Sequence, residues 1–235
     1  MISNNLFSLK GKTALVTGGS TGIGLMATVG LVSAGAKVFI VSRKLENCQN
    51  AAKELNNYGF EGEVIPFRGD LSSEAGINNI INEIYSKNSK LHILINNAGR
   101  TWGSDLSSFP YDAWAKVLNL NVSAIFYLTQ KLVPLLESSS KSDFPSRVVN
   151  IGSVMGEVPM GDGAYSYAAS KSAVHHITRI LAKELAERNI TVNALSPGPF
   201  QSNMTDFAMG DSKGTMRVSK RVPLKRIGQT DDIAA

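Results

Sequence analysis

Short, continuous runs of apolar residues recur along this sequence and constrain its fold more than any other feature. Four such runs lie at positions 12–17, 37–42, 64–67 and 91–95, and two further strands are predicted over 147–151 and 190–195. Runs without polar alternation are typical of strands in a parallel sheet that is covered on both faces. Segments with helical spacing of apolar residues separate them, as at Ile77, Ile80, Ile81 and Ile84. We therefore expect an α/β fold with a doubly wound parallel sheet, the Rossmann fold, and right-handed crossovers.

Helices are predicted between these strands, over residues 45–57, 73–86, 112–138 and 164–187, with an earlier one that ends at Gly35. Residues 200–226 are rich in Met, Ser and Gly and are expected to be irregular or locally helical. Thr230 is placed to cap the first turn of one more helix, over 230–235. No low-complexity stretch or linker interrupts the pattern, so we expect residues 1–235 to form a single domain.

Composition narrows the class of protein. The chain has 235 residues, of which 43% are hydrophobic and 18% charged, as in ordinary globular proteins. Its one cysteine, Cys48, excludes an internal disulfide and a cysteine-based metal cluster, and no metal site is expected. The first ten residues lack the apolar core of a signal peptide, and no apolar run has the length of a membrane span, so a cytoplasmic protein is expected. The net charge of +5 favours acidic or phosphate-bearing partners, but no basic run with interleaved aromatics favours nucleic acid.

A glycine-rich loop follows the first apolar run and opens the first helix. Its glycines, Gly18, Gly22 and Gly24, have the spacing Gly-x-x-x-Gly-x-Gly. Glycine allows positive φ and the close approach of main chain to a ligand, and a helix N-terminus attracts phosphate. We expect this loop, including Ser20, Thr21 and Ile23, to bind the pyrophosphate of a dinucleotide. A turn with a purely structural role is the alternative.

The end of the second strand indicates which nucleotide binds. A carboxylate that would bind the adenosine ribose of NAD is absent between positions 39 and 45, where the sequence instead has Ser42, Arg43 and Lys44. A guanidinium suits a 2′-phosphate, so NADP (NADPH) is expected over NAD, with solvated charges as the alternative. Further cofactor contacts are expected from Asp70 and Leu71 to the adenine, and from Asn97, Ala98 and Gly99 to the adenosine ribose.

Tyr167 and Lys171 are four residues apart on a predicted helix, so their side chains share one face. A phenol has a pKa of about 10 in water, and a neighbouring cation lowers it. The pair therefore predicts an acid/base group that works near neutral pH, although a solvated pair would have the same spacing. Tyr165 is a decoy in this respect, because Ala169 stands four residues after it.

Taken together, these motifs resemble the classical short-chain dehydrogenase/reductase family over essentially the whole chain. The resemblance rests on Thr17-Gly18-x-x-x-Gly22-Ile23-Gly24, Asn96-Asn97-Ala98-Gly99, Ser153, Tyr167-x-x-x-Lys171 and Pro197-Gly198, in the family's order and spacing. It implies that Asn121 anchors a proton-relay water, although a polar residue that kinks its helix is the alternative. It also implies that Ser153 holds the substrate carbonyl, Tyr167 is the acid/base and Lys171 binds the cofactor ribose. Pro197, Gly198, Phe200 and Ser202 are expected beside the nicotinamide.

Within the family, the sequence is most similar to bacterial 3-oxoacyl-acyl-carrier-protein reductases of the type linked to rhamnolipid synthesis. This implies NADPH-dependent reduction of a ketone to a secondary alcohol, with a 3-oxoacyl thioester as substrate. A sugar, polyol or steroid alcohol would fit the same residues, and a non-catalytic NADP-binding regulator or a structural oligomer are further alternatives. Members usually complete the last helix and add an edge strand, which this sequence would lack after position 235.

Partners are expected at two surfaces. Residues 200–226 should form a mobile lid whose apolar side chains suit an acyl chain, namely Phe200, Met204, Phe207, Met209 and Met216. The same region is basic and could dock an acidic carrier protein through Lys213, Arg217, Lys220, Arg221, Lys225 and Arg226, with Arg188 as a further candidate. A solvated basic loop is the alternative. The resemblance implies a homotetramer or dimer built on the helices at 112–138 and 164–187, with Val174, Ile177 and Leu181 expected to face outward.

Overall fold

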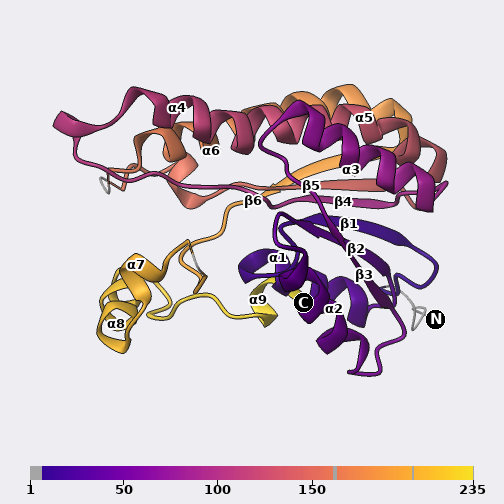
Figure 1. Ribbon diagram of the computed structural model, residues 1–235, viewed down its shortest axis with the longest axis horizontal. Helices are drawn as coiled ribbons and strands as arrows, with labels where there is room; N and C mark the ends of the chain where they lie inside the picture. Colours follow the sequence, from indigo (N-terminus) through magenta and orange to yellow (C-terminus); the bar gives the residue numbers. More distant parts are fainter. Residues whose placement is uncertain (1–6, 161–162, 203, 235) are drawn as a thin grey trace.

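The computed structural model describes residues 7–160, 163–202 and 204–234, and it contains one six-stranded parallel sheet (Figure 1). The strand order is β3-β2-β1-β4-β5-β6. The strands are β1 (Thr13–Thr17), β2 (Lys37–Ser42), β3 (Glu63–Arg68), β4 (Ile93–Asn96), β5 (Ser146–Ile151) and β6 (Ile190–Leu195). The order reverses between β1 and β4, as in a doubly wound sheet. The predicted fold class is therefore confirmed, with a strand at each of the six predicted positions.

Helices cover both faces of the sheet (Figure 1). One face carries α3 (Glu74–Lys87), α5 (Ala124–Ser139) and α6 (Tyr165–Leu185), and the other carries α1 (Gly22–Ser33), α2 (Leu45–Asn56) and the short α9 (Asp231–Ala234). Alternate strand residues feed the two cores: Leu15 packs into the first and Val16 into the second. Strands β1, β2 and β4 are buried on both faces, which explains their continuous apolar runs, whereas the edge strand β6 alternates buried with exposed residues.

The long helix predicted over 112–138 is interrupted in its middle. It consists of α4 (Tyr111–Leu118), a π-helical turn η2 (Asn119–Ser123) and α5. Asn121 lies inside that turn and is fully buried. Single π-helical turns inside α-helices often occur at functional sites, because they reorient the side chains that they contain. Asn121 thus lies where the helix departs from regular α-helical geometry, and its role in a proton relay stays a prediction.

The inward face of α6 differs from the prediction. Val174 is fully buried, Leu181 is only 7% exposed, and Ile177 packs against the core in a half-buried position. The expectation that these residues face outward was wrong. The outward apolar side chain on this helix is Ile180, which is 50% exposed.

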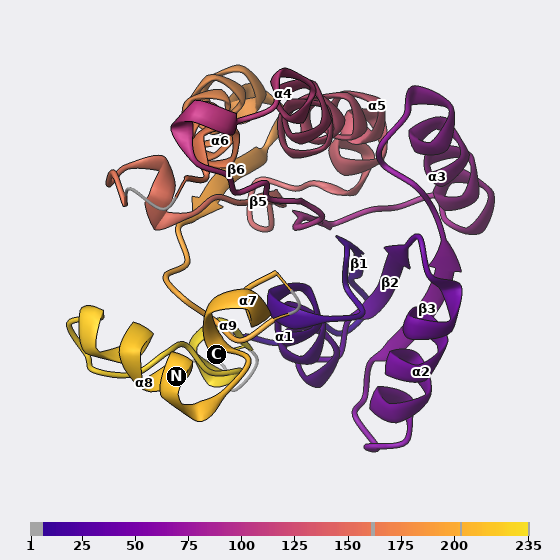
Figure 2. The ribbon, with the colours of Figure 1, turned by 60° about the vertical axis from the view of Figure 1, so that its left-hand side comes forward.

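The segment after β6 leaves the sheet and forms a separate helical lobe, described by α7 (Asp206–Met209) and α8 (Ser212–Arg221) (Figure 2). It returns through a bridge between Phe200 and Gly228. Phe200 and Met209 are buried within it, while Met216 is 60% exposed. The Phe207 side chain lies outside the described residues. The local helices agree with the prediction for residues 200–226, and α9 begins directly after Thr230, as expected.

Arg226 is held within this lobe. It donates two hydrogen bonds to Asp232, of 2.5 and 2.8 Å, and the same carboxylate accepts a bond from the main chain of Gln229. The guanidinium holds the pKa of Asp232 well below its usual range. Arg226 is therefore not available as part of a free basic surface.

None of the helices in the described residues is long and apolar enough to cross a membrane.

Candidate active site

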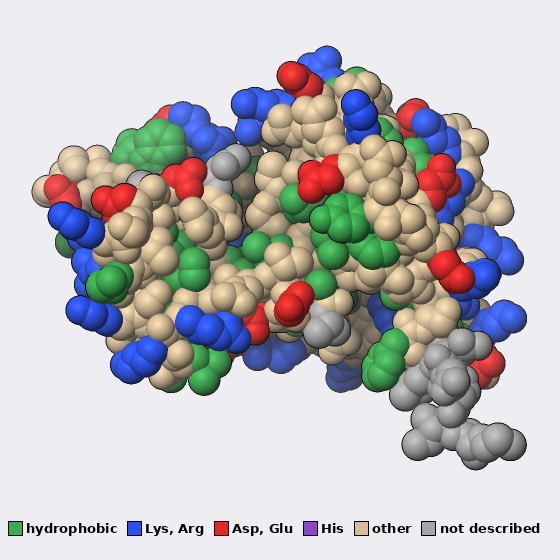
Figure 3. All heavy atoms as spheres, turned by 90° about the horizontal axis from the view of Figure 1, so that it is seen from below, with side chains coloured by type: hydrophobic (Ala, Val, Ile, Leu, Met, Phe, Trp, Pro, Cys, Tyr) green, Lys and Arg blue, Asp and Glu red, His purple; other side chains and the backbone are tan. Residues whose placement is uncertain are grey.

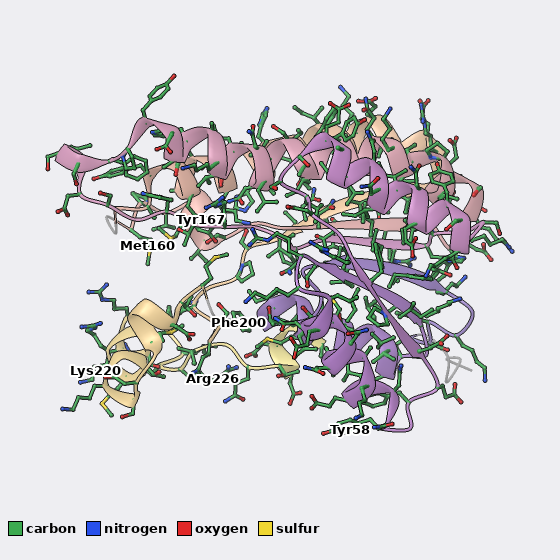
Figure 4. The ribbon with its side chains drawn as sticks, viewed as in Figure 1. Tyr58, Met160, Tyr167, Phe200, Lys220 and Arg226 are labelled. Carbon is green, nitrogen blue, oxygen red and sulfur yellow. The ribbon has the colours of Figure 1, made fainter. Side chains whose placement is uncertain are left out.

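A cavity of about 570 Å³ opens at the carboxyl ends of the strands, where the strand order reverses. This is the place where doubly wound sheets bind ligands. The predicted site residues that line it are Gly18, Thr21, Gly22, Ile23, Ser42, Arg43, Asp70, Leu71, Asn97, Ala98, Gly99, Ser153, Tyr167, Lys171, Pro197, Gly198, Phe200 and Ser202. Tyr167 and Phe200 lie on opposite sides of the opening (Figure 4). Four predicted residues do not line the cavity, namely Ser20, Gly24, Lys44 and Asn121.

The glycine-rich loop folds tightly against the end of β4. Gly18 and Gly22 have φ values of +66° and +54°, which favour glycine. Gly24 lies behind the cavity, and a Cβ there would overlap Gly18 O and Asn97 Nδ2. The Asn97 amide donates to Thr17 O (2.9 Å) and Gly18 O (3.2 Å), so it ties the loop to β4. Gly24 and Asn97 therefore shape the loop, while Gly18, Thr21, Gly22 and Ile23 line the ligand space at the N-terminus of α1.

The end of β2 presents a cation to the cavity. Arg43 lines it and forms no ion pair with a carboxylate in the part of the chain that the structure describes, whereas Lys44 does not line it. Across the cavity, burial opposes ionisation of Asp70, but hydrogen bonds from Ser72 and the charges of Arg43 and Arg68 outweigh it and lower the Asp70 pKa. An unpaired guanidinium at this position fits a 2′-phosphate, and no carboxylate at the end of β2 would repel it.

Ser153, Tyr167 and Lys171 meet at the other end of the cavity. Ser153 follows β5, and its Oγ accepts a hydrogen bond from the Met155 amide at 3.2 Å. Tyr167 and Lys171 occupy successive turns at the start of α6, and the Lys171 Nζ lies 5.5 Å from the centre of the Tyr167 ring. Lys171 is only 4% exposed, and its Nζ donates to Ile151 O at 2.6 Å. The three side chains thus come from the loop after β5, which carries Ser153, and from α6, which carries Tyr167 and Lys171.

Burial dominates the titration of both groups on α6. It lowers the pKa of Lys171 from 10.5 to about 8, so the amine is still mostly protonated at neutral pH. Burial also raises the pKa of Tyr167, and the Ser153 hydroxyl opposes this rise only in part. Lys171 was expected to lower the tyrosine pKa, but in this structure burial raises it, and the Lys171 ammonium donates instead to a main-chain carbonyl.

Asn121 is close to the site but uses its side chain elsewhere. Its Oδ1 accepts from the Arg100 amide, and its Nδ2 donates to Arg100 O and to Ser170 Oγ, each at 2.9 Å. Ser170 Oγ in turn donates to Tyr167 O at 2.6 Å. The π-helical turn is thereby connected both to the loop after β4 and to the helix that carries Tyr167.

Tyr165 is separate from the cavity. It is 40% exposed and packs edge-on against Phe109, with 5.3 Å between the ring centres. The choice of Tyr167 over Tyr165 thus agrees with the geometry. The cavity also contains residues that sequence reasoning did not select, namely Val41, Gly69, Arg100, Thr101, Leu120, Ile151, Gly152 and Thr205. Several of them adjoin selected motifs, and Arg100 directly follows Asn96–Gly99, so extending each motif by one or two residues would have found them.

Comparisons with known proteins agree with this site. A model of the short chain dehydrogenase family matches residues 12–212. The sequence is 45% identical over 229 residues to the rhamnolipids biosynthesis 3-oxoacyl-[acyl-carrier-protein] reductase of Pseudomonas aeruginosa, covering 97% of this chain and 88% of that one. It is 32% identical to the 5-keto-D-gluconate 5-reductase of Escherichia coli K12, over 98% of this chain and 88% of that one.

A solved structure gives the same result. The Pseudomonas aeruginosa RhlG/NADP active-site complex superimposes with a TM-score of 0.93 at 44% sequence identity, covering 99% of this chain and 90% of that chain. The family-wide match, the high identity and the shared fold leave no ambiguity about membership. This chain belongs to the short-chain dehydrogenase/reductase family of oxidoreductases.

Proposed function

We propose that this protein uses NADPH to reduce a ketone to a secondary alcohol, and that the ketone is a 3-oxoacyl thioester. The observation that carries the proposal is the joining of two half-sites in one cavity. Ser153, Tyr167 and Lys171 lie at one end, and the glycine-rich loop with Arg43 lies at the other. A cavity of this kind suits a dinucleotide that delivers its hydride beside an acid.

Each half-site has a defined task in this proposal. Main-chain amides of residues 18–23 bind the pyrophosphate, and Arg43 binds the 2′-phosphate. NADPH supplies the hydride when it is bound. Because Ser153 Oγ already accepts from Met155, its own proton is available to hydrogen-bond the substrate carbonyl. Tyr167 donates the proton as charge develops on that oxygen, and the buried ammonium of Lys171 stabilises the phenolate left behind.

We assign the return of the proton to a water near Asn121 and to Lys171. Both amide hydrogens of the Asn121 side chain are used by Arg100 and Ser170, and its Oδ1 already accepts from the Arg100 amide, which favours the main chain of the π-helical turn as the group that holds that water. In this proposal the Asn121 side chain fixes the π-helical turn, and a main-chain carbonyl of that turn binds the water.

The substrate assignment draws on the relative that is 45% identical and is named a 3-oxoacyl-[acyl-carrier-protein] reductase. Met204 lines the cavity, and Met216 is exposed on α8, which gives an adaptable apolar surface for an acyl chain. A sugar-acid ketone is the second candidate, because a relative at 32% identity is named a 5-keto-D-gluconate 5-reductase.

We further propose that α8 docks the carrier protein. Figure 3 shows Lys and Arg side chains along the edge of the molecule over α7 and α8, and Lys220 points away from the body of the protein (Figure 4). The cations of this face are Lys213, Arg217, Lys220, Arg221 and Lys225. No ion pair joins any of them to a carboxylate within the described residues. An acidic carrier would therefore meet unpaired positive charge on the expected lid itself, residues 200–226.

A homotetramer or dimer is also proposed, built on α4, α5 and α6. Phe126 and Ile180 are 40% and 50% exposed on the outer surfaces of α5 and α6, and Trp114 on α4 is 36% exposed. Light scattering coupled to gel filtration would measure the mass, and a monomer at micromolar concentration would contradict the assembly.

The function is tested by NADPH oxidation with matched ketones. We expect turnover of a 3-oxoacyl-carrier thioester, weaker turnover of the same acyl group on coenzyme A, and little with 5-ketogluconate. Arg217→Glu should raise KM about fivefold for the carrier-bound substrate only, because surface charge acts mainly on encounter. Lys53→Glu on α2 is the control for net charge. NADPH binding without oxidation of any ketone would instead support a regulator, and preference for 5-ketogluconate would support the second candidate.

A further inference from the structure

The loop that carries Ser153 is packed around one buried imidazole. His175 is 7% exposed and lies on α6, one turn after Lys171 and two turns after Tyr167. A Cβ at Gly152 would overlap its Nε2, and a Cβ at Gly156 would lie 2.8 Å from its Cε1. The glycines on both sides of Ser153 therefore leave the space that this ring fills.

The ring also bonds to the loop. The Ser153 amide donates to His175 Nε2 at 3.3 Å, and Ser196 Oγ at the end of β6 lies 3.1 Å from the same nitrogen. Since Nε2 accepts the amide hydrogen, the neutral ring has its proton on Nδ1. Nδ1 lies 3.3 Å from Glu157 Oε1 without an aligned hydrogen bond, so the carboxylate favours a proton on Nδ1 through its charge alone.

We propose that His175 is a positioning residue that sets the Ser153 hydroxyl relative to Tyr167. Tyr167, Lys171 and His175 are each four residues apart, so they share one face of α6. Helix α6 thereby carries the acid, Tyr167, directly. It also positions Ser153, the serine that binds the carbonyl, through the imidazole of His175. Glu157 keeps the ring in the accepting form. This inference rests on the proposed function, in which both Ser153 and Tyr167 reach the substrate carbonyl.

Simple packing by His175 is the competing explanation, and variants separate the two. His175→Leu fills similar space without an acceptor, whereas His175→Gln keeps an amide oxygen that can accept. We expect His175→Leu to lower kcat about tenfold to a hundredfold with NADPH affinity unchanged, because a small misplacement of a reacting group has effects of this size. His175→Gln should recover much of that loss. His176→Leu, at the exposed neighbouring position, should leave activity unchanged.

A double-mutant cycle tests whether His175 acts through Ser153. In a Ser153→Ala background, His175→Leu should cause little further loss of kcat, because the hydroxyl that it positions is gone. Full additivity of the two losses would overturn the proposal. So would wild-type kcat in His175→Leu, or a loss in His175→Gln as large as in His175→Leu when both melt at the wild-type temperature.

Amide hydrogen exchange gives a readout that does not depend on turnover. The Ser153 amide should exchange about tenfold faster in His175→Leu than in wild type or His176→Leu, because it loses its acceptor. Unchanged exchange would overturn the positioning role even if the ketone assignment is correct. Faster exchange in a protein that reduces no ketone would support the contact and contradict only the proposed function.

Discussion

The two ends of the cavity are built in opposite ways. At the end of β1 the ligand space is formed by main chain, with Gly18 and Gly22 at positive φ and Gly24 in close contact behind them. At the end of β5 it is formed by side chains of Ser153, Tyr167 and Lys171. The first end should therefore be sensitive to added volume, and the second to lost functional groups. Variants at each end test this contrast.

The largest effect is expected at the β5 end. Tyr167→Phe removes one oxygen and no volume, so NADPH affinity and the melting temperature should change little. Without the proton donor, kcat should fall by about 10² to 10⁴. Stopped-flow measurement of NADPH oxidation, with fluorescence titration of NADPH, measures both quantities.

Tyr165→Phe is the matched control, because Tyr165 lies two residues away on the same helix but packs on Phe109 outside the cavity. It should retain wild-type turnover. Equal losses in the two variants would contradict the assignment of Tyr167 as the acid.

The second effect is the loss of the cofactor through one added methyl group at the β1 end. In Gly24→Ala the new Cβ would overlap Gly18 O and Asn97 Nδ2, so the loop must shift. We expect the free energy of unfolding to fall by about 1–3 kcal/mol, the usual range for overpacking. NADPH binding, measured by calorimetry, should weaken strongly. Gly103→Ala is the control, since nothing lies within 4 Å of its Cβ; a Gly24→Ala protein that binds NADPH like Gly103→Ala would refute the contrast.

A third, smaller effect concerns the one cationic side chain on which the β1 end depends. Arg43→Ala should weaken NADPH binding about 10- to 100-fold and leave NADH binding unchanged, because a charge-assisted bond to the 2′-phosphate is lost. Lys44→Ala should have a much smaller effect, as Lys44 does not line the cavity. The ratio of KM for NADPH to KM for NADH measures this, and an equal effect of the two variants would show that general positive charge is sufficient.

The smallest effect lies at the amino ends of the central strands β1 and β4, away from the cavity at their carboxyl ends. His92 is 6% exposed and accepts the Thr13 amide through Nδ1, and burial, with the charges of Lys12 and Lys90, lowers its pKa to about 4. Its folded-state pKa is below the unfolded value of about 6.5, so its contribution is complete above pH 6.5 and is lost as pH falls toward 4.

We expect a loss of about 1–3 kcal/mol in the free energy of unfolding between these pH values, measured by urea denaturation. His92→Asn can still accept the Thr13 amide but does not titrate, so its stability should vary less over the same range. Parallel pH profiles for the two proteins would contradict this explanation.

The features that sequence could predict are those that only one residue type satisfies. Glycine at positive φ identified the loop, and uninterrupted apolar runs identified the buried strands. The inner face of α6 was misassigned because polar residues are buried there as well: Thr178 Oγ accepts from Asn150 Nδ2 at 2.9 Å within the core. When buried hydroxyl and amide groups form hydrogen bonds with one another, the spacing of apolar residues no longer indicates which face of a helix is inward.

Two other features, the pKa of Tyr167 and the hydrogen bonds of Asn121, cannot be predicted from the spacing of residues in the sequence. The pKa of Tyr167 follows from burial, which raises it, against the hydrogen bond with Ser153, which lowers it, and only the packed structure shows that burial is larger. The bonds between Asn121 and Arg100 join main chain and side chain 21 residues apart. Such a contact exists only after the fold has brought the end of β4 beside the helix.

The π-helical turn at Asn119–Ser123 also limits how this protein can be redesigned. A π turn holds more residues than a turn of regular α-helix, so it offsets α4 and α5 from each other in rotation. Deleting one residue there would give a straighter helix with better local geometry, but it would rotate either Val117 or Leu128 out of the core by about 100°. Consensus or computational straightening of this helix should therefore produce a protein with a more regular backbone and a less stable fold.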